Sequence, residues 1–276
     1  MRLYFAGDIS GGYNEEALYC RSADMRWRLL SFSHISEKGN GGDIDFWSSD
    51  AAPRPFFLDS GAYSAMTRGV TIDFAGYCDF IERYIDKIDP YASLDVIGDW
   101  KGSAVHHDKM LAQGLNPIPT FHFGSPIEEL RRLLKIADYV ALGGMVGKDQ
   151  TTVRLWLDKC WNVIKDYWPK KIHSFGNMAP STITRYPWYS ADSASSVIGG
   201  SMGRVHNLRN GELNSYSYID YSRKFMDTTP LDHLSPYSKP NGSAFVGRRL
   251  LNVRTQRALE RYVTDLWQYK GITWES

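Results

Sequence analysis

The chain has few cysteines and no long apolar run, and both shortages narrow its class. Its three cysteines, Cys20, Cys78 and Cys160, are odd in number and widely separated. This spacing excludes a zinc-ribbon pattern and argues against a disulfide framework, so we expect a reducing, cytoplasmic compartment. No apolar run approaches the roughly 20 residues of a membrane span. The first residues turn polar too early for a signal peptide, so we expect no membrane partner.

The sequence also lacks a strong net charge, an internal repeat and a low-complexity tract. A formal net charge of +1 gives no global sign of a polyanionic partner, so a nucleic-acid surface has to be a local patch. Hydrophobic content of 43% and charged content of 23% are ordinary for a globular protein. At 276 residues the chain can bury a large single core.

Short apolar segments alternate with helical patterns along the first two thirds of the chain. They are apolar on both faces, as parallel strands covered by helices are. Eight such strands with intervening helices predict an α/β fold, a (β/α)8 barrel of the TIM type. The predicted strands cover residues 2–6, 28–33, 56–62, 91–98, 117–123, 138–145, 171–176 and 188–198.

Several of the intervening helices have readable boundaries or stripes. Residues 73–87 carry apolar side chains at helical spacing, and residues 151–167 repeat the pattern. Ser125 and Pro126 predict an N-cap followed by the first helical position.

The last part of the chain differs in composition. We predict a barrel catalytic domain over residues 1–200 and, over residues 201–276, a helical extension packed on it. The extension is polar and turn-rich to about residue 247, and a long helix is predicted over residues 248–270. Its arginines have two interpretations, a solvated face on a helix packed against the barrel or a patch that contacts nucleic-acid phosphates. The arginines assigned to that patch are Arg204, Arg248, Arg249, Arg254 and Arg257.

Three predicted strand ends deliver an aspartate. Asp59 ends the apolar run that begins at Phe56, and Asp95 and Asp192 follow segments of the same shape. The carboxyl ends of barrel strands meet at one mouth, where these enzymes keep their chemistry. Burial and like charges separate carboxyl pKa values there, so that one group can act as an acid while another stays ionised. Two carboxyls flanking a glycosidic carbon give retaining glycosyl transfer through a covalent intermediate.

Other strand ends add groups suited to a flat ligand. Gly143 and Gly144 let backbone groups approach closely, and Tyr63 is placed to stack on a planar base. Taken by themselves, His122 and His173 are read as hydrogen-bonded framework. Without a cluster of ligands we infer no metal, and no cofactor is predicted.

One further histidine pair has a simpler interpretation. His106 and His107 occupy neighbouring positions of a predicted helix, which face apart. We therefore expect both at the surface.

Four motifs, taken in chain order, resemble those of tRNA-guanine transglycosylases. Residues 59–63 resemble their Asp-Ser-Gly-Gly-Tyr/Phe motif, and residues 142–147 look like their Gly-Gly-Leu-x-Val-Gly loop. Residues 173–176 resemble a glycine-rich strand end of that family, and residues 189–192 its nucleophile segment.

Two more segments are similar to the short phage-type branch, the 7-deazaguanine DNA transglycosylases. They are residues 94–99 and 119–122. The tRNA enzymes carry a Cys/His zinc site after the barrel, whereas this chain has no cysteine after Cys160 and therefore no zinc subdomain. The resemblance thus favours DNA as the partner, with tRNA as the alternative, and the host cytoplasm if a phage encodes the chain.

The resemblance implies a base exchange. Asp192 would attack C1′ of the target nucleoside and expel guanine, and Asp59 would shuttle the proton between the leaving guanine and an incoming 7-deazaguanine. Asp95 would read the edge of the base. The residues implied in binding the substrate are Ser60, Tyr63, Asp95, His122, Gly143, Gly144, Met145, His173 and Gly176.

Two positions depart from the family pattern. Ala62 replaces the motif's second glycine, which is a mild change. Lys148 stands where the family has a glutamate that helps it take a cationic aminomethyl base. A lysine disfavours a cation, so the implied incoming base is neutral, such as the nitrile-bearing preQ0.

Two other classes of function stay open from the residues alone. A retaining nucleoside or glycoside hydrolase would use the same carboxyl pair and need no incoming purine. A catalytically silent binding module would instead use the arginine-bearing helix as its active surface.

Overall fold

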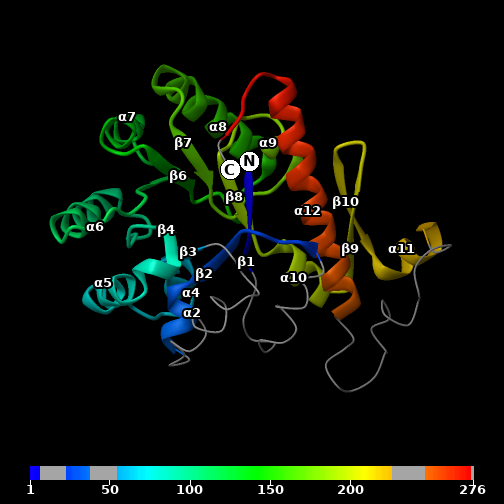
Figure 1. Ribbon diagram of the computed structural model, residues 1–276, viewed down its shortest axis with the longest axis horizontal. Coiled ribbons are helices and arrows are strands. Elements are labelled where there is room, and N and C mark those ends of the chain that lie inside the picture. The colour runs from blue at the N-terminus through cyan, green and yellow to red at the C-terminus, as the bar shows by residue number, and fades with distance from the viewer. Residues whose placement is uncertain (7–22, 38–54, 226–245, 275–276) are drawn as a thin grey trace.

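The protein is seen in a computed structural model that describes residues 1–6, 23–37, 55–225 and 246–274 (Figure 1). Eight strands form one parallel sheet, and each lies within or beside a strand predicted from the sequence. The sheet order is β4-β3-β2-β1-β8-β7-β6-β5. The strands are β1 (Arg2–Ala6), β2 (Arg28–Ser31), β3 (Phe56–Asp59), β4 (Ile88–Tyr91), β5 (Thr120–His122), β6 (Tyr139–Gly143), β7 (Lys171–Ser174) and β8 (Ser190–Ser193).

The two outer strands of this order meet, so that the sheet curls into a barrel. Ala92, just after β4, forms a parallel bridge with Ile118, just before β5. The Ile118 N–H donates to the Tyr91 carbonyl at 2.8 Å, and the Ser93 N–H donates to the Ile118 carbonyl at 2.9 Å. The predicted (β/α)8 barrel of the TIM type is therefore confirmed.

Helices follow most strands and surround the sheet (Figure 1). Asp73 and Asp149 cap two of them, since their carboxylates accept from the N–H groups of Gly76 at 2.8 Å and Thr152 at 2.9 Å. These two helices confirm the predictions over residues 73–87 and 151–167, where short 3-10 turns at Ile85–Lys87 and Lys165–Tyr167 complete the helical stretch. The helices are α2 (Phe32–Glu37), α4 (Ala62–Thr67), α5 (Phe74–Arg83), α6 (Trp100–Ala112), α7 (Ile127–Ile136), α8 (Gln150–Ile164), α9 (Pro180–Ile183) and α10 (Ser195–Ser201).

Several predicted boundaries are wrong, and three of them bear on the site or its helices. The strand predicted over residues 91–98 ends at Tyr91, because the chain then turns into α6. The strand predicted to residue 198 ends at Ser193, whose Oγ accepts from the Ser195 N–H at 3.0 Å and so begins α10. Pro126, not Ser125, is the N-cap of α7, because its extended backbone lies outside the helix.

The barrel interior is filled by side chains that face its axis. Residues two positions further along a strand face the same way. Asp59 therefore follows Phe57 toward the mouth on β3, and Gly143 follows Ala141 on β6. The interior cluster comprises Tyr4, Trp27, Leu29, Phe57, Ala92, Ile118 and Ala141.

A hairpin and a short helix follow the barrel, where the sequence predicts only a turn-rich stretch. The antiparallel strands are β9 (Arg204–Arg209) and β10 (Glu212–Ser217), and α11 (Tyr218–Phe225) comes next. Asn210 and Gly211 join the strands with φ of 52° and 80°. Positive φ at both residues is the geometry of a two-residue type I′ turn, and Asn-Gly is its strongest sequence signal.

The predicted C-terminal helix is α12 (Val246–Tyr269), and it lies along the barrel beside the hairpin (Figure 1). Leu259, Val263 and Trp267 are buried in the large cluster that also holds core residues of the barrel. Apolar packing on the barrel is thus one observed role of this helix. None of the described helices is long and apolar enough to cross a membrane.

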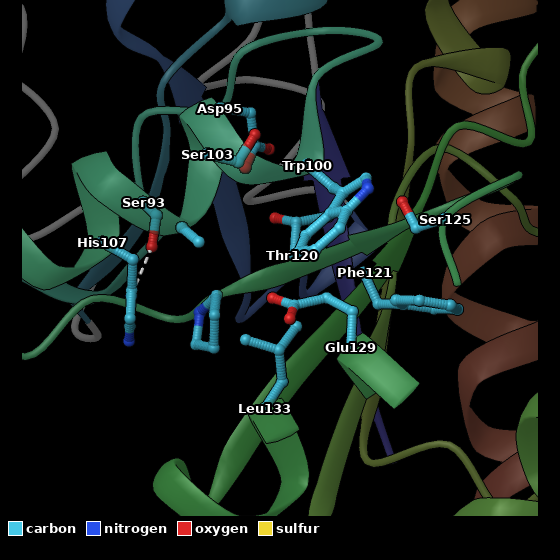
Figure 2. A pocket seen from close by; sticks show the side chains of 12 residues that line it. Ser93, Asp95, Trp100, Ser103, His107, Thr120, Phe121, Ser125, Glu129 and Leu133 are labelled. Carbon is cyan, nitrogen blue, oxygen red and sulfur yellow. Dashed lines mark hydrogen bonds between the residues drawn. The ribbon is translucent and has the colours of Figure 1, made fainter. Parts of the chain in front are cut away.

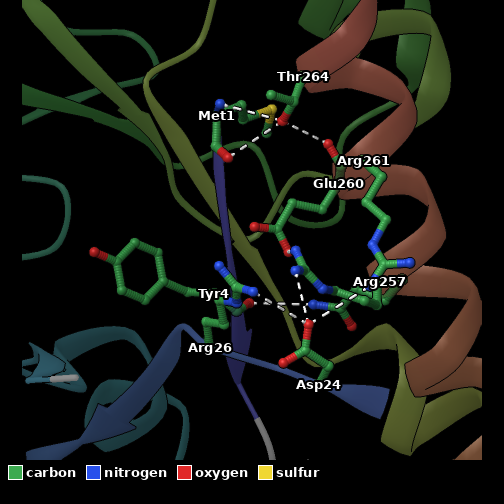
Figure 3. Close-up of polar contacts among 9 residues, drawn as sticks. Met1, Tyr4, Asp24, Arg26, Arg257, Glu260, Arg261 and Thr264 are labelled. Atoms are coloured by element: carbon green, nitrogen blue, oxygen red, sulfur yellow. Dashed lines mark hydrogen bonds and ion pairs between the residues drawn. The ribbon is translucent and has the colours of Figure 1, made fainter. Parts of the chain in front are cut away.

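Polar contacts also fix α12 to the barrel (Figure 3). Arg257 donates to Asp24 at 3.1 Å and lies 2.8 Å from the Glu260 carboxylate. Gln256 donates to the Tyr4 carbonyl on β1 at 3.3 Å. Arg257 therefore joins the segment before β2 to the helix.

The other arginines of the predicted phosphate patch differ in position. Arg248 is only 1% exposed and donates to the Gly200 carbonyl, and Arg249 donates to the Ser201 hydroxyl. Arg204 and Arg254 are exposed. These contacts give Arg248, Arg249 and Arg257 a packing role, and phosphate contact by Arg204 and Arg254 stays a prediction.

Candidate active site

Residues from six strands or strand ends lie at the carboxyl end of the barrel. Asp59 is the last residue of β3, and Asp192 lies one residue before the end of β8. His122 and Gly143 end β5 and β6. The charges of both Asp192 and Asp95 act on Asp59, so the three predicted aspartates share one site.

Asp59 is a partly buried carboxyl in front of a sharp turn. This turn requires glycine at position 61. Gly61 has φ of +74°, and a Cβ added there would lie 2.3 Å from the Ser31 hydroxyl. Burial, together with the charge of Asp192 and the smaller effect of Asp95, raises the pKa of Asp59 to about 7. Asp59 can therefore hold or release a proton near neutral pH.

Asp95 pairs with His122 at the mouth. His122 Nε2 lies 3.3 Å from Asp95 Oδ2. Although burial opposes a charged ring, Asp95 raises the pKa of His122 above its ordinary value. The second oxygen, Oδ1, is buried, and no described residue donates a hydrogen bond to it. A buried acceptor without a partner is costly, so this oxygen suits a donor brought by a ligand.

Asp192 is 7% exposed and is held through one oxygen. Its Oδ1 accepts from the Gly176 N–H at 2.8 Å and lies 3.3 Å from His173 Nε2. Gly176 has φ of +63°, and its added Cβ would lie 3.0 Å from a Val146 methyl group. Neither contact is made by Oδ2.

His173 is fully buried, and its ring contacts Ser190 as well as the Asp192 carboxylate. Its Nδ1 lies 2.6 Å from Ser190 Oγ, and the Tyr139 hydroxyl bonds to the same Ser190. Sequence reasoning missed Ser190 and Tyr139. They are 51 residues apart in the chain, so no local pattern signals their contact.

The remaining predicted binding residues lie around this mouth or just behind it. Gly144 follows the end of β6, and Tyr63 is 49% exposed on α4. Ser60 is buried and its hydroxyl accepts from the Ala62 N–H at 3.4 Å. The Met145 side chain is buried and accepts from the Asn177 amide at 3.5 Å, so a ligand would meet its backbone.

The surface position expected for His107 is wrong. His107 is 2% exposed, and its Nδ1 lies 2.8 Å from Ser93 Oγ (Figure 2). The buried positions Ser103, His107 and Met110 share helical spacing, and that stripe was the available signal. The small cavity in Figure 2 is lined by Ser93, His107, Asp95, Thr120 and Glu129 among others.

The site offers acid–base and nucleophilic chemistry. Asp192 is an anchored carboxylate, and Asp59 is a neighbouring carboxyl whose proton is exchangeable near pH 7. Two such groups can perform a double displacement at an electrophilic carbon. Among the described residues, no three His, Cys, Asp or Glu side chains gather as they would around a metal ion.

Comparison with known proteins gives a fold and no family. No protein-family model matches the chain, and no curated protein matches it. The motif resemblance to transglycosylases is therefore without support at the family level.

Solved structures resemble the barrel at low sequence identity. A protein from Aquifex aeolicus VF5 shares 9% identity over 93% of this chain and 92% of that chain, with a TM-score of 0.52. The carboxyl transferase domain of Rhizobium etli pyruvate carboxylase shares 9% identity over 94% of this chain and 48% of that chain, with a TM-score of 0.50. The tryptophan synthase complex of Pyrococcus furiosus shares 11% identity over 71% of this chain and 88% of that chain, with a TM-score of 0.46. At such identities the likeness to the first two shows the barrel fold alone.

Proposed function

We propose that this protein is a base-exchange glycosyltransferase that replaces guanine in DNA with a 7-deazaguanine. One observation carries the proposal. Asp192 is anchored at one oxygen by the Gly176 amide, while neighbouring Asp59 has its pKa raised to about 7. A fixed carboxylate beside a carboxyl that exchanges its proton near pH 7 is the pair that retaining glycosyl transfer needs.

The first half of the reaction breaks the glycosidic bond. Asp192 Oδ2, the oxygen outside the Gly176 contact, attacks C1′ of the target nucleoside. The C1′–N9 bond breaks, and its electron pair leaves with guanine, which takes a proton from Asp59. The sugar is then held as an ester of Asp192.

The second half reverses these roles. Asp59, now a carboxylate, removes the N9 proton of the incoming base, and N9 attacks C1′. The ester bond breaks and Asp192 leaves as a carboxylate. Two inversions at C1′ give net retention, and Asp59 ends as it began, protonated.

Base recognition is assigned to the other half of the mouth. A guanine edge presents N1–H and an exocyclic amine, both donors. Asp95 has a buried oxygen that no described residue bonds, and His122 fixes its other oxygen. A base lacking those donors would leave Asp95 Oδ1 buried and unpaired, which disfavours it.

The choice of polymer and of incoming base rests on the sequence. The chain has no cysteine after Cys160 and so no Cys/His zinc element of the tRNA enzymes, which favours DNA. Lys148 Nζ lies 4.6 Å from the centre of the Phe123 ring, just beyond the residue 143–147 loop. A cation at this place favours a neutral 7-substituent, such as the nitrile of preQ0. A target in a duplex has to be flipped out of the stack.

Incorporation of labelled base tests the proposal. The full-length protein is incubated with labelled guanine or labelled preQ0 and with duplex DNA or bulk tRNA. We expect label in DNA only. Label in tRNA would keep the mechanism and overturn the polymer, and free guanine released without an incoming base would favour a hydrolase.

Two variants define the background. Asp192→Asn keeps an oxygen for the Gly176 amide but cannot form the ester, so incorporation should fall to background. Ser93→Ala removes a buried serine from outside the proposed site, and it should still incorporate label. Equal incorporation by Asp192→Asn and the parent would overturn the nucleophile.

A further inference from the structure

A chain of buried hydrogen-bonding groups leads from the barrel interior to Asp192. The Tyr139 hydroxyl bonds to Ser190 Oγ, and Ser190 Oγ lies 2.6 Å from His173 Nδ1. On the other side of the ring, His173 Nε2 lies 3.3 Å from Asp192 Oδ1. Ser190 and Asp192 are two residues apart on β8, so both face the barrel axis.

Burial decides the charge state of this histidine. His173 is 0% exposed and packs against the rings of Tyr4, Phe57 and Phe175, with centroids 6.1, 4.6 and 4.4 Å away. Desolvation in this aromatic cage lowers the pKa of His173, although Asp192 opposes the shift. The imidazole is therefore neutral and carries one N–H.

The neighbours of the ring decide where that proton sits. Asp192 Oδ1 is a carboxylate acceptor 3.3 Å away, so a favourable contact places the N–H of His173 at Nε2. Its Nδ1 is then an acceptor and takes the hydroxyl proton of Ser190. Burial raises the pKa of Tyr139, so its phenol stays protonated and donates to Ser190.

Tyr139 therefore donates to Ser190 and Ser190 donates to His173 Nδ1, which leaves the Nε2–H of the ring facing Asp192 Oδ1 at 3.3 Å. We propose that Tyr139, Ser190 and His173 are positioning residues that fix the neutral Nε2–H tautomer and hold Asp192 Oδ1, leaving Oδ2 to react. The relay rests on the proposed function for its effect on turnover, whereas the tautomer is independent of it.

The same three residue types make the Ser-His-Asp triad of hydrolases, but here their order is reversed. In that triad the serine attacks substrate from the Nε2 side and the aspartate orients Nδ1. In this protein Ser190 contacts Nδ1 and is 0% exposed, while Asp192 faces Nε2 at the mouth. Ser190 cannot meet a substrate, and Asp192 is the member that can.

His173 is enclosed by aromatic rings, so its ring does not contact the substrate directly. A ring with no exposed surface acts on substrate only through Asp192. His173 orients Asp192, much as the hydrogen-bond partners of a metal ligand orient that ligand.

The tautomer is measured by NMR on the full-length protein labelled with ¹⁵N-histidine. The seven histidines give a small set of signals, and those of His173 are the ones lost in His173→Gln. We expect a protonated Nε2 and an unprotonated Nδ1 at pH 7. In Ser190→Ala the ring loses its donor at Nδ1, and the signals should shift toward the other tautomer. A protonated Nδ1 in the parent protein would overturn the relay, whether or not the protein exchanges bases.

Turnover is measured by label incorporation in four variants whose folding is checked by thermal unfolding. Ser190→Ala and His173→Leu should lower kcat on the order of 100-fold, the effect expected of a misplaced reacting group, with KM for the base unchanged. His173→Gln brings an amide N–H toward Asp192 and should recover at least about tenfold over His173→Leu. Ser93→Ala breaks a matched Ser–His contact of 2.8 Å to His107 and should leave kcat at the parent value.

Equal kcat in His173→Gln and His173→Leu, or a parent-like kcat in Ser190→Ala, would overturn the positioning role. Absence of exchange in the parent protein would refute the proposed function and with it the effect on turnover, while the NMR result would still decide the tautomer.

Discussion

The backbone amide of Gly176 donates a hydrogen bond of 2.8 Å to Oδ1 of Asp192, so that the turn just after β7 contacts the neighbouring strand β8. A main-chain donor is held by the barrel itself and does not depend on a rotamer. It fixes which oxygen of the carboxylate is engaged and directs the other one away from this contact. Preorganised dipoles of this kind need no rearrangement during the reaction.

Replacing Gly176 should therefore strain the backbone and displace the N–H group that holds Asp192. Its φ of +63° is strained for alanine, and the added Cβ would lie 3.0 Å from Val146. We expect Gly176→Ala to lose about 1–2 kcal/mol of stability and most of the exchange activity. Urea unfolding and label incorporation measure the two effects.

A second substitution separates the two causes of that loss. Val146 is 55% exposed, so Val146→Ala relieves the clash without opening a core cavity. The double variant Gly176→Ala/Val146→Ala should recover the steric part and keep the backbone strain. Full recovery would show that positive φ is irrelevant here.

Asp59 should make stability depend on pH. Its folded-state pKa of about 7 lies above the ordinary value of 3.8, because of burial and the charges of Asp192 and Asp95. Well below pH 3.8 both states are protonated. As pH rises toward 7 the unfolded chain releases the proton and the folded protein holds it, so the contribution of Asp59 to stability falls.

Asp59→Asn should remove that pH dependence. We expect its stability advantage over the parent protein to grow by about 2–3 kcal/mol between pH 5 and pH 8. Urea unfolding of both proteins at the two pH values measures it. The variant should also lose exchange, because an amide cannot carry the proton between bases. An advantage that does not change with pH would show that Asp59 is already ionised in the folded protein.

Asp95 should control both the charge of His122 and the affinity for base. Asp95 raises the pKa of His122 against the effect of burial. In Asp95→Asn burial alone remains, so the pKa of His122 should fall below its ordinary value, which NMR titration of the ring measures. Binding of labelled guanine should weaken by about 1.5–3 kcal/mol, the strength of a hydrogen bond to a charged group.

A matched variant keeps this prediction specific. His122→Gln removes the ring and keeps a neutral donor toward Asp95, so guanine binding should fall less than in Asp95→Asn. Equal binding by Asp95→Asn and the parent protein would refute the recognition role.

The sequence predicts the three aspartates at the mouth better than the buried residues that hold them in place. Each apolar run that ends in Asp59, Asp95 or Asp192 carries its own signal, because a buried strand followed by a polar residue is a local pattern. The Tyr139–Ser190 contact joins residues 51 positions apart, and only the closed barrel brings them together. No spacing rule within one segment contains that information.

Two other features that differ from the prediction, the hairpin and the burial of His107, do carry local signals in the sequence. Asn210-Gly211 marks a hairpin turn, although composition alone suggested a loop. His107 shares a helical stripe with Ser103 and Met110, although adjacency to His106 suggested the surface. Composition and adjacency are weaker guides than periodicity, since burial follows the face of an element.

Arg257 should matter for stability far more than its neighbour Arg261. The Arg257 side chain is 12% exposed and pairs with Glu260, which is 4% exposed, whereas Arg261 is 63% exposed and lies 3.5 Å from Asp24. Arg257→Ala removes the arginine partner of a buried carboxylate and should cost about 3–5 kcal/mol, while Arg261→Ala should cost under about 1 kcal/mol. Adding Glu260→Gln to Arg257→Ala should restore part of the loss. Similar losses of stability in the two alanine variants would contradict the larger role given to Arg257 over Arg261 (Figure 3).

The exposed Arg254 should report on DNA contact without a change in folding. It lies on α12 three residues before Arg257, but its side chain is exposed. If it contacts a phosphate, Arg254→Ala should weaken duplex binding about equally across sequences and reduce the slope of log K against log salt by about 1. Fluorescence anisotropy with a labelled duplex at several salt concentrations measures that slope. Thermal unfolding should match the parent protein, because an exposed arginine on a packed helix contributes little to stability. An unchanged salt slope with unchanged stability would place the DNA surface elsewhere than on this face of α12.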